Sequence, residues 1–239
     1  MVNLGKKTES PEPRRRVAAI VPARNEEKTI GEVLKTLLSS KKFDEIIVVD
    51  GASSDKTVEV SENLGVKVLS SLTREGKGSA MKNGLRATDA EIVVFFDADI
   101  LGLTESHILQ IINPVIKREV VMCTGERGHY WGLPYIISKI DPLSAIGGER
   151  AIRRSILENI PEKFIQSFAV ETSLNYYCKV NNLPTALVEL KGLKLVPKEK
   201  KWGLAKGLSD RIKELLQLII IRLVIFLNKN EFTQKNKFR

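Results

Sequence analysis

Apolar runs of the length of a β-strand recur through the first half of the chain. They span residues 17–21, 46–49, 66–69 and 92–96, and a weaker fifth run follows at 120–122. Most are continuous and rich in β-branched residues, which is typical of strands that are covered on both faces. The pattern predicts a buried sheet rather than a sheet with one solvated face.

Segments with the 3.6-residue period of a helix lie between these runs, within residues 30–38, 58–64, 80–87 and 108–115. The alternation predicts an α/β fold with a mostly parallel sheet flanked by helices. Residues 125–150 have glycines, prolines and no clear period, which predicts a functional loop region. A helix at about 170–180 and a strand at 185–190 are predicted after it.

The last periodic segment, residues 209–228, predicts a C-terminal amphipathic helix with a wide apolar face. Its start is polar, and no run in the chain reaches the roughly 18 apolar residues of a membrane span. The segment could lie on a membrane surface, contact a second subunit in a homodimer, or be covered by the protein's own sheet.

Charge is distributed unevenly along the 239 residues. Residues 191–239 carry 13 basic and 4 acidic side chains, whereas residues 1–190 carry 25 of each. We therefore expect a neutral body with a basic tail that faces an anionic partner such as an anionic membrane surface, and no nucleic acid partner. The expected divisions are a flexible N-terminus over 1–15, a body over 16–204 and a basic C-terminal helix and tail over 205–239.

The two cysteines, Cys123 and Cys178, are too few and too far apart for a disulfide framework or a zinc site. The N-terminus has no apolar run of the length found in a secretory signal. Both observations predict a cytoplasmic protein, peripheral at the inner face of the membrane if the C-terminal helix binds lipid.

Three of the predicted strands end in polar clusters, at residues 22–27, 50–55 and 97–99. In a parallel sheet these ends share one edge, where ligands bind. Asp97 and Asp99 are spaced so that both can reach one Mg²⁺ or Mn²⁺ ion, with phosphate supplying further ligands. The alternative is a turn with two solvated aspartates. Asp55 precedes a helical segment and is predicted to cap it.

Gly76-Lys77-Gly78 precedes a predicted helix, where backbone N–H groups and a lysine favour an anion. An ordinary loop has the same composition. The segment does not match the Walker pattern, and no Gly-x-Gly-x-x-Gly follows a strand.

The order and spacing of these segments over residues 17–100 resemble family 2 glycosyltransferases, which have the Rossmann-like GT-A fold. The resemblance implies a catalytic GT-A domain over 16–204, a nucleotide-sugar donor (a UDP-sugar first, a GDP-sugar second) and Mg²⁺ or Mn²⁺. By position it implies that Asp97 and Asp99 hold ribose and metal-diphosphate, with Lys77 near the base or ribose-phosphate. The residues implied to hold the nucleoside are Pro22, Ala23, Arg24, Asn25, Glu26 and Asp50.

The second half resembles the branch that includes glucosyl-3-phosphoglycerate synthases. Glu171 and Asp99 are implied as the catalytic residues, with Glu171 as the general base or the group that orients the acceptor. The alternative reading of Glu171 is a carboxylate at a helix start that the helix dipole favours. The residues implied to bind the acceptor are Gly147, Gly148, Glu149 and Arg150.

Three departures from the family pattern qualify this resemblance. Gly51 follows Asp50 where a second acid is common, and residues 192–197 lack the branch's metal-binding histidine. The only histidines, His107 and His129, are not expected to be ligands. The Gln-x-x-Arg-Trp signature of processive synthases is also missing.

The sequence therefore predicts a metal-dependent, non-processive transfer of one sugar to a phosphorylated acceptor. The acceptor is polyprenyl phosphate or a small phospho-acid held by Arg150, Arg153 or Arg154. A nucleotidyltransferase-like enzyme is an alternative that the missing Gly-x-Gly-x-Arg segment argues against. A non-catalytic nucleotide-sugar-binding module is the other.

Overall fold

The computed structural model describes residues 15–74, 76–127, 129–130, 133–134, 148–161, 164, 169–195, 220, 223–224 and 227–232. These residues contain a seven-stranded sheet in the order β10-β6-β9-β4-β1-β2-β3. Its strands are β1 (Val17–Ala23), β2 (Glu45–Asp50), β3 (Lys67–Ser70), β4 (Ile92–Phe95), β6 (Met122–Glu126), β9 (Arg150–Arg153) and β10 (Thr185–Glu189). All pair in parallel except β9, which is antiparallel to both β4 and β6. The predicted mostly parallel α/β sheet is confirmed.

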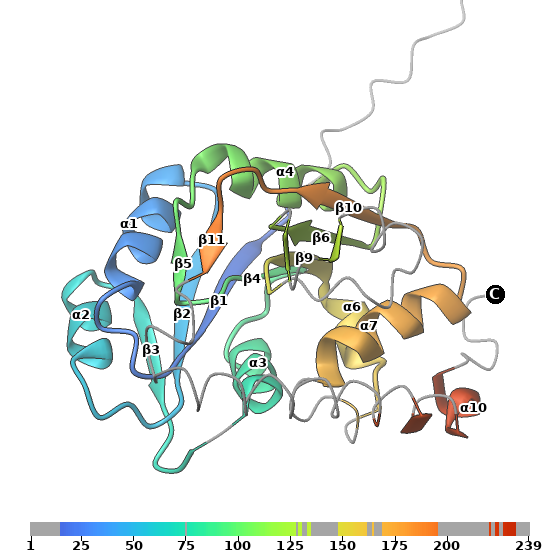
Figure 1. Cartoon of the computed structure of the whole chain (residues 1–239), viewed down its shortest axis with the longest axis horizontal. Helices are drawn as coiled ribbons and strands as arrows, with labels where there is room; N and C mark the ends of the chain where they lie inside the picture. Colours follow the sequence, from blue (N-terminus) through green and yellow to red (C-terminus); the bar gives the residue numbers. More distant parts are fainter. Residues whose placement is uncertain are drawn as a thin grey trace, which may run out of the picture.

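Helices cover both faces of this sheet, as Figure 1 shows. One face carries α1 (Ile30–Ser40), α2 (Thr57–Asn63) and α4 (Glu105–Ile116). The other carries α3 (Lys77–Arg86), α6 (Arg154–Glu158) and α7 (Ala169–Val180). Neighbouring residues of β1 enter different cores, because Val21 packs with α1 and α4 whereas Ile20 packs with α3. This double coverage explains why the strands read as continuous apolar runs.

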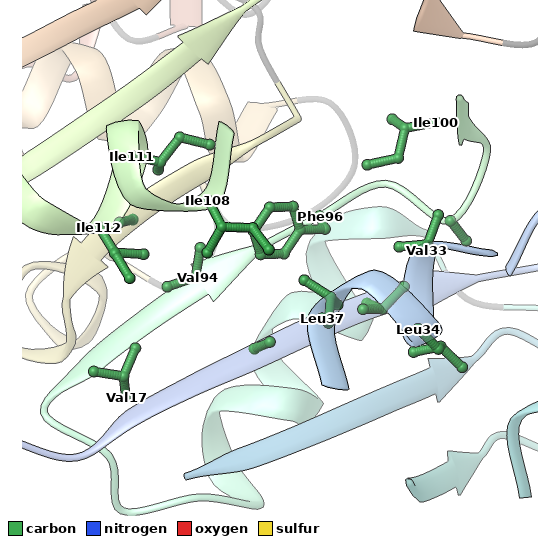
Figure 2. Close-up of a cluster of buried hydrophobic side chains, with 14 of the residues drawn as sticks. Val17, Val33, Leu34, Leu37, Val94, Phe96, Ile100, Ile108, Ile111 and Ile112 are labelled. Atoms are coloured by element: carbon green, nitrogen blue, oxygen red, sulfur yellow. The ribbon is translucent and has the colours of Figure 1, made fainter. Parts of the chain in front are cut away.

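The core under α1 and α4 fixes the end of β4. Phe96 lies between Ile108 of α4 and Leu37 of α1 in Figure 2, and all three side chains are fully buried. Phe43 packs edge-on against the Phe96 ring at a centroid distance of 6.0 Å. Asp97 follows directly, so this apolar anchor sets where its carboxylate emerges.

Two elements differ from the sequence expectations. The strand predicted at 120–122 runs instead from Met122 to Glu126, and β9 was not predicted. The sequence of β9, Arg-Ala-Ile-Arg, has only two apolar residues, so it lacks the signal of a buried strand. Two short pairs complete the fold: β5 (Ile100–Leu101) with β11 (Lys194–Leu195), and β7 (His129–Tyr130) with β8 (Leu133–Pro134).

The short helix α10 (Lys229–Phe232) packs against α7. The Phe232 ring is buried, 4.5 Å from the Phe164 ring and 5.2 Å from the Tyr176 ring by centroid distance. The Asn181 side-chain amide donates to the Phe232 carbonyl at 2.8 Å. Most of the predicted helix at 209–228 lies outside the described residues, as do residues 1–14. Within the described part of the chain, no helix is both long and apolar enough to span a bilayer.

Candidate functional site

The carboxyl ends of β1, β2 and β4 and the start of α3 surround one open cavity of about 200 Å³. This is the edge at which ligands of parallel α/β sheets bind. The residues that line it are Pro22, Ala23, Arg24, Glu26, Gly51, Gly76, Lys77, Ala80, Asp97, Ala98 and Asp99. The structure thus brings together residues from all three polar clusters and from the Gly76-Lys77-Gly78 segment.

Asn25 and Asp50 are not among these lining residues, and both bind the loop that follows β2. The Asn25 backbone N–H donates to the Ser53 hydroxyl at 2.9 Å, and the Ser54 N–H donates to Asn25 Oδ1 at 2.8 Å. Asn25 has a φ of 55°, a left-handed conformation that asparagine tolerates better than most residues. The Asp50 carboxylate accepts from the Ser53 N–H at 3.1 Å and from its hydroxyl. Both residues shape the rim of the cavity, and their nucleoside contacts remain predictions.

Asp55 joins this rim to the start of α2. Its carboxylate accepts from the Thr57 N–H at 3.0 Å and from the Glu27 N–H at 3.1 Å. Burial alone would raise the pKa of Asp55, but a hydrogen bond from the Thr57 hydroxyl together with these two outweighs burial and lowers it. The cap position of α2 is Lys56, not Asp55 as predicted, and Asp55 instead ties the loop after β1 to the loop after β2.

Lys77 joins two acidic residues of the site. Its Nζ lies 2.7 Å from Asp97 Oδ1 and 2.8 Å from Glu171 Oε1, and the Lys77 side chain is 24% exposed. Burial alone would lower the pKa of Lys77, but the charges of Asp97 and Glu171 raise it well above its usual value. Lys77 is therefore a permanent cation between the end of β4 and the start of α7.

Arg127, which the sequence reasoning missed, holds the other side of Asp97. Its Nη2 lies 3.3 Å from Asp97 Oδ2, and its Nε lies 3.4 Å from Glu149 Oε2. Burial alone would raise the pKa of Asp97, but Lys77 and Arg127 together lower it. Its place in the sequence could have revealed Arg127, because it directly follows the parallel strand β6. The predicted strand ended at residue 122, so this position was hidden.

Glu149 is a completely buried carboxylate beside this cluster. Burial raises the pKa of Glu149 to about 7, even though Arg127 acts in the opposite direction. Its neighbour Gly148 packs so closely on Asp97 that a β-carbon there would overlap the carboxylate. Gly148 and Glu149 thus form a wall behind Asp97, and their acceptor contacts remain predictions. Gly147 lies outside the described residues.

Arg150 is also completely buried, beneath Glu171. Its Nη1 donates to the Glu171 carbonyl at 3.5 Å, and burial lowers the pKa of the guanidinium. From this position Arg150 supports the backbone of Glu171. Its direct contact with an acceptor remains a prediction. Arg154 pairs with Glu158 at 2.7 Å on the surface. His107 contacts the Lys191 carbonyl at 3.0 Å, which is a structural role.

The carboxylates of the cavity suit a divalent cation that takes most of its ligands from a substrate. Asp97 and Asp99 both line the cavity, and the described residues contain no cluster of three or more His, Cys, Asp or Glu side chains that could hold a metal alone. Mg²⁺ is commonly bound by one or two carboxylates together with phosphates and waters. Both Asp97 oxygens already contact cationic side chains. Asp97 is thus held between two cationic side chains, and metal binding by Asp97 and Asp99 remains a prediction.

Comparison with known proteins finds relatives of similar sequence. The chain is 29% identical over 195 residues to glucosyl-3-phosphoglycerate synthase of Petrotoga mobilis, covering 65% of this chain and 58% of the relative. It is 34% identical over 117 residues to an uncharacterized protein of Methanocaldococcus jannaschii, covering 46% of each. The chain thus spans about half the length of these curated relatives.

A crystal structure of glucosyl-3-phosphoglycerate synthase from Mycobacterium tuberculosis, in complex with Mn²⁺, UDP and glucosyl-3-phosphoglycerate, matches with a TM-score of 0.65 and 25% identity. The match covers 76% of this chain and 72% of that one. The sequence model described as glycosyl transferase family 2 matches residues 18–169, which is more than half of the chain. The protein therefore belongs to glycosyl transferase family 2.

Proposed function

We propose that the protein transfers one sugar from a nucleotide-sugar to a small phosphorylated acid. One observation carries the proposal: Lys77, Asp97 and Asp99 line a single cavity, and Glu171 contacts Lys77 at 2.8 Å. The complex of the M. tuberculosis relative with UDP and a sugar-phosphoglycerate product supports a UDP-sugar and a phospho-acid over a GDP-sugar and polyprenyl phosphate. The transfer is proposed to be non-processive, because the sequence lacks the Gln-x-x-Arg-Trp signature of processive synthases.

The donor's diphosphate is proposed to lie between the start of α3 and the end of β4. Lys77 is the first residue of α3, so its ammonium and the N-terminal N–H groups of the helix present positive charge at one place. Asp99, with Asp97, would hold Mg²⁺ or Mn²⁺, which neutralises charge on a departing diphosphate. Lys77 stabilises the same negative charge as the bond to the sugar breaks.

Glu171 is proposed to orient the acceptor or accept its proton. Its side chain is only 6% exposed and contacts Lys77, so its position is fixed before a substrate arrives. A carboxylate held at the substrate's reacting hydroxyl contributes both orientation and general base catalysis. Arg150 supports the backbone of the same residue from below.

A donor and acceptor screen tests this proposal. Nucleotide release is measured for UDP-, GDP- and dTDP-sugars, with and without Mn²⁺, using 3-phosphoglycerate or a polyprenyl phosphate as the acceptor. We expect UDP release that depends on both Mn²⁺ and the phospho-acid, and none from the Asp99→Ala control. Pyrophosphate release from a nucleoside triphosphate would instead indicate a nucleotidyltransferase. Tight UDP-sugar binding with no turnover for any acceptor would indicate a binding module.

A further inference from the structure

Four exposed apolar side chains form a stripe near the C-terminus. Ile220, Leu223, Val224 and Leu227 are 57%, 57%, 38% and 78% exposed. Their spacing of three, four and seven residues places them on one face of a helix. Among the described residues, the other large apolar side chains that are exposed (Leu38, Leu72, Leu101 and Ile116) lie apart along the chain. These four residues are called the C-terminal stripe below.

The C-terminal stripe is attached to the body of the protein at its far end. Phe232, five residues after Leu227, is buried against Phe164 and Tyr176, and its carbonyl accepts from Asn181. The sequence left open that this segment is covered by the protein's own sheet. The exposure of all four stripe residues contradicts that alternative for them.

Charge decides between the two remaining occupants, a second copy of the chain and a lipid surface. Residues 191–239 hold the whole positive surplus of the protein, with 13 basic and 4 acidic side chains. In the sequence, Arg222 lies within the stripe and Lys229 shortly after it. Two stripes packed together would bring like charges into a desolvated contact, which is unfavourable. An anionic bilayer instead attracts the basic residues while it takes up the apolar ones.

We propose that the C-terminal stripe docks on an anionic lipid surface. The stripe's side chains enter the boundary between headgroups and acyl chains, and the basic residues of the tail contact the phosphates. The body is held at the surface through the Phe232 anchor. This interaction is independent of the proposed sugar transfer, which uses the cavity at the carboxyl edge of the sheet.

The test is co-sedimentation of the full chain with vesicles of phosphatidylcholine alone or mixed with phosphatidylglycerol. We expect binding only to the mixed vesicles, weakened in high salt because the exposed charges are screened. The double variant Leu223→Glu/Leu227→Glu should bind at least about tenfold more weakly, since it replaces inserted apolar area with charge. Leu72→Glu is the control, because it changes a leucine outside the stripe that is still more exposed, and it should bind like the wild type.

A second measurement reports the contact directly. Leu227→Cys can be labelled selectively with an environment-sensitive dye, because Cys123 and Cys178 are buried. We expect a blue shift on mixed vesicles and none on phosphatidylcholine. Equal binding of the double variant and the wild type would overturn the proposal. A wild-type dimer in solution that the double variant converts to a monomer would also overturn it, in favour of a second copy.

Discussion

The α-carbon of Gly148 packs directly on the carboxylate of Asp97, and no β-carbon fits between them. This contact joins the start of the antiparallel strand β9 to the end of β4. The Asp97 carboxylate is thereby enclosed on three sides, by Gly148, by Lys77 and by Arg127. Its position is fixed by the protein before any ligand binds.

The Gly148→Ala variant should lose activity with little loss of structure. The added methyl group must push the Asp97 carboxylate aside, and a displacement of about 1 Å in a catalytic site costs roughly hundredfold in rate. We expect kcat/KM to fall by about that factor while the circular dichroism spectrum is unchanged.

Gly31→Ala is the control for this substitution. A β-carbon there would lie 3.4 Å from Val60 Cγ1, an ordinary contact, so activity should be retained. Wild-type kinetics in Gly148→Ala would show that the Asp97 position is not critical.

The centre of the main sheet was predictable because strands such as β1 and β4 are buried on both faces. Residues such as Ile20 and Val21 of β1 are both apolar for this reason, and they produce the continuous runs. The strand β9 was not predictable in this way, since two of its four residues are arginines. Arg150 is nevertheless fully buried there, because its guanidinium finds protein partners such as the Glu171 carbonyl.

The location of the cavity was predictable from the sequence, but the ion pairs among its charged side chains were not. Strand ends identify the edge of the sheet, which is how Asp97 and Asp99 were found, and the Gly76-Lys77-Gly78 segment before a predicted helix identified Lys77. The contact between Lys77 and Glu171 joins residues 94 apart in the sequence. No local pattern encodes such a pair, because it depends on how α3 and α7 pack on the same face. The Arg127 contact with Glu149 was hidden because the predicted strand ended at residue 122, before the end of β6.

Asp99→Ala should abolish sugar transfer while the protein stays folded. Asp99 lines the cavity and is proposed to hold the divalent cation, so its loss removes stabilisation of the leaving diphosphate. We expect a fall in kcat of at least about 10²–10³-fold, measured as initial rates over a Mn²⁺ titration. Activity within about tenfold of the wild type, unaffected by EDTA, would exclude Asp99 from metal binding.

The two cysteines should be protected from thiol reagents in the folded protein. Burial raises the pKa values of Cys123 and Cys178 to about 12, from an ordinary value of 9.0. At pH 8 we expect no reaction of the native protein with Ellman's reagent and reaction of both thiols in denaturant. Rapid modification of the native protein would mean that the sheet opens readily around Cys123.

The raised pKa values of the two thiols also predict how the stability of the protein changes in alkaline solution. Between pH 9 and pH 12 the unfolded thiols lose protons that the folded protein retains, so the free energy of unfolding should fall as pH rises. A melting temperature measured from pH 8 to pH 10 should therefore decrease at the upper end. Replacement of both cysteines by alanine should reduce this pH dependence, and an unchanged slope would assign it to other groups.

Glu171→Gln should reduce turnover far more than donor affinity. The substitution keeps the shape of the side chain and removes the charge that is proposed to act on the acceptor hydroxyl. Lys77 then loses one of its two acidic partners, which leaves its charge more available to a diphosphate. We expect kcat to fall about 10²-fold or more while the donor Kd changes by less than about threefold. Glu32→Gln, a surface carboxylate paired with Lys35 on α1, is the matched control and should behave like the wild type. If donor binding collapses in Glu171→Gln while the control is normal, Glu171 acts on the nucleotide through Lys77 rather than on the acceptor.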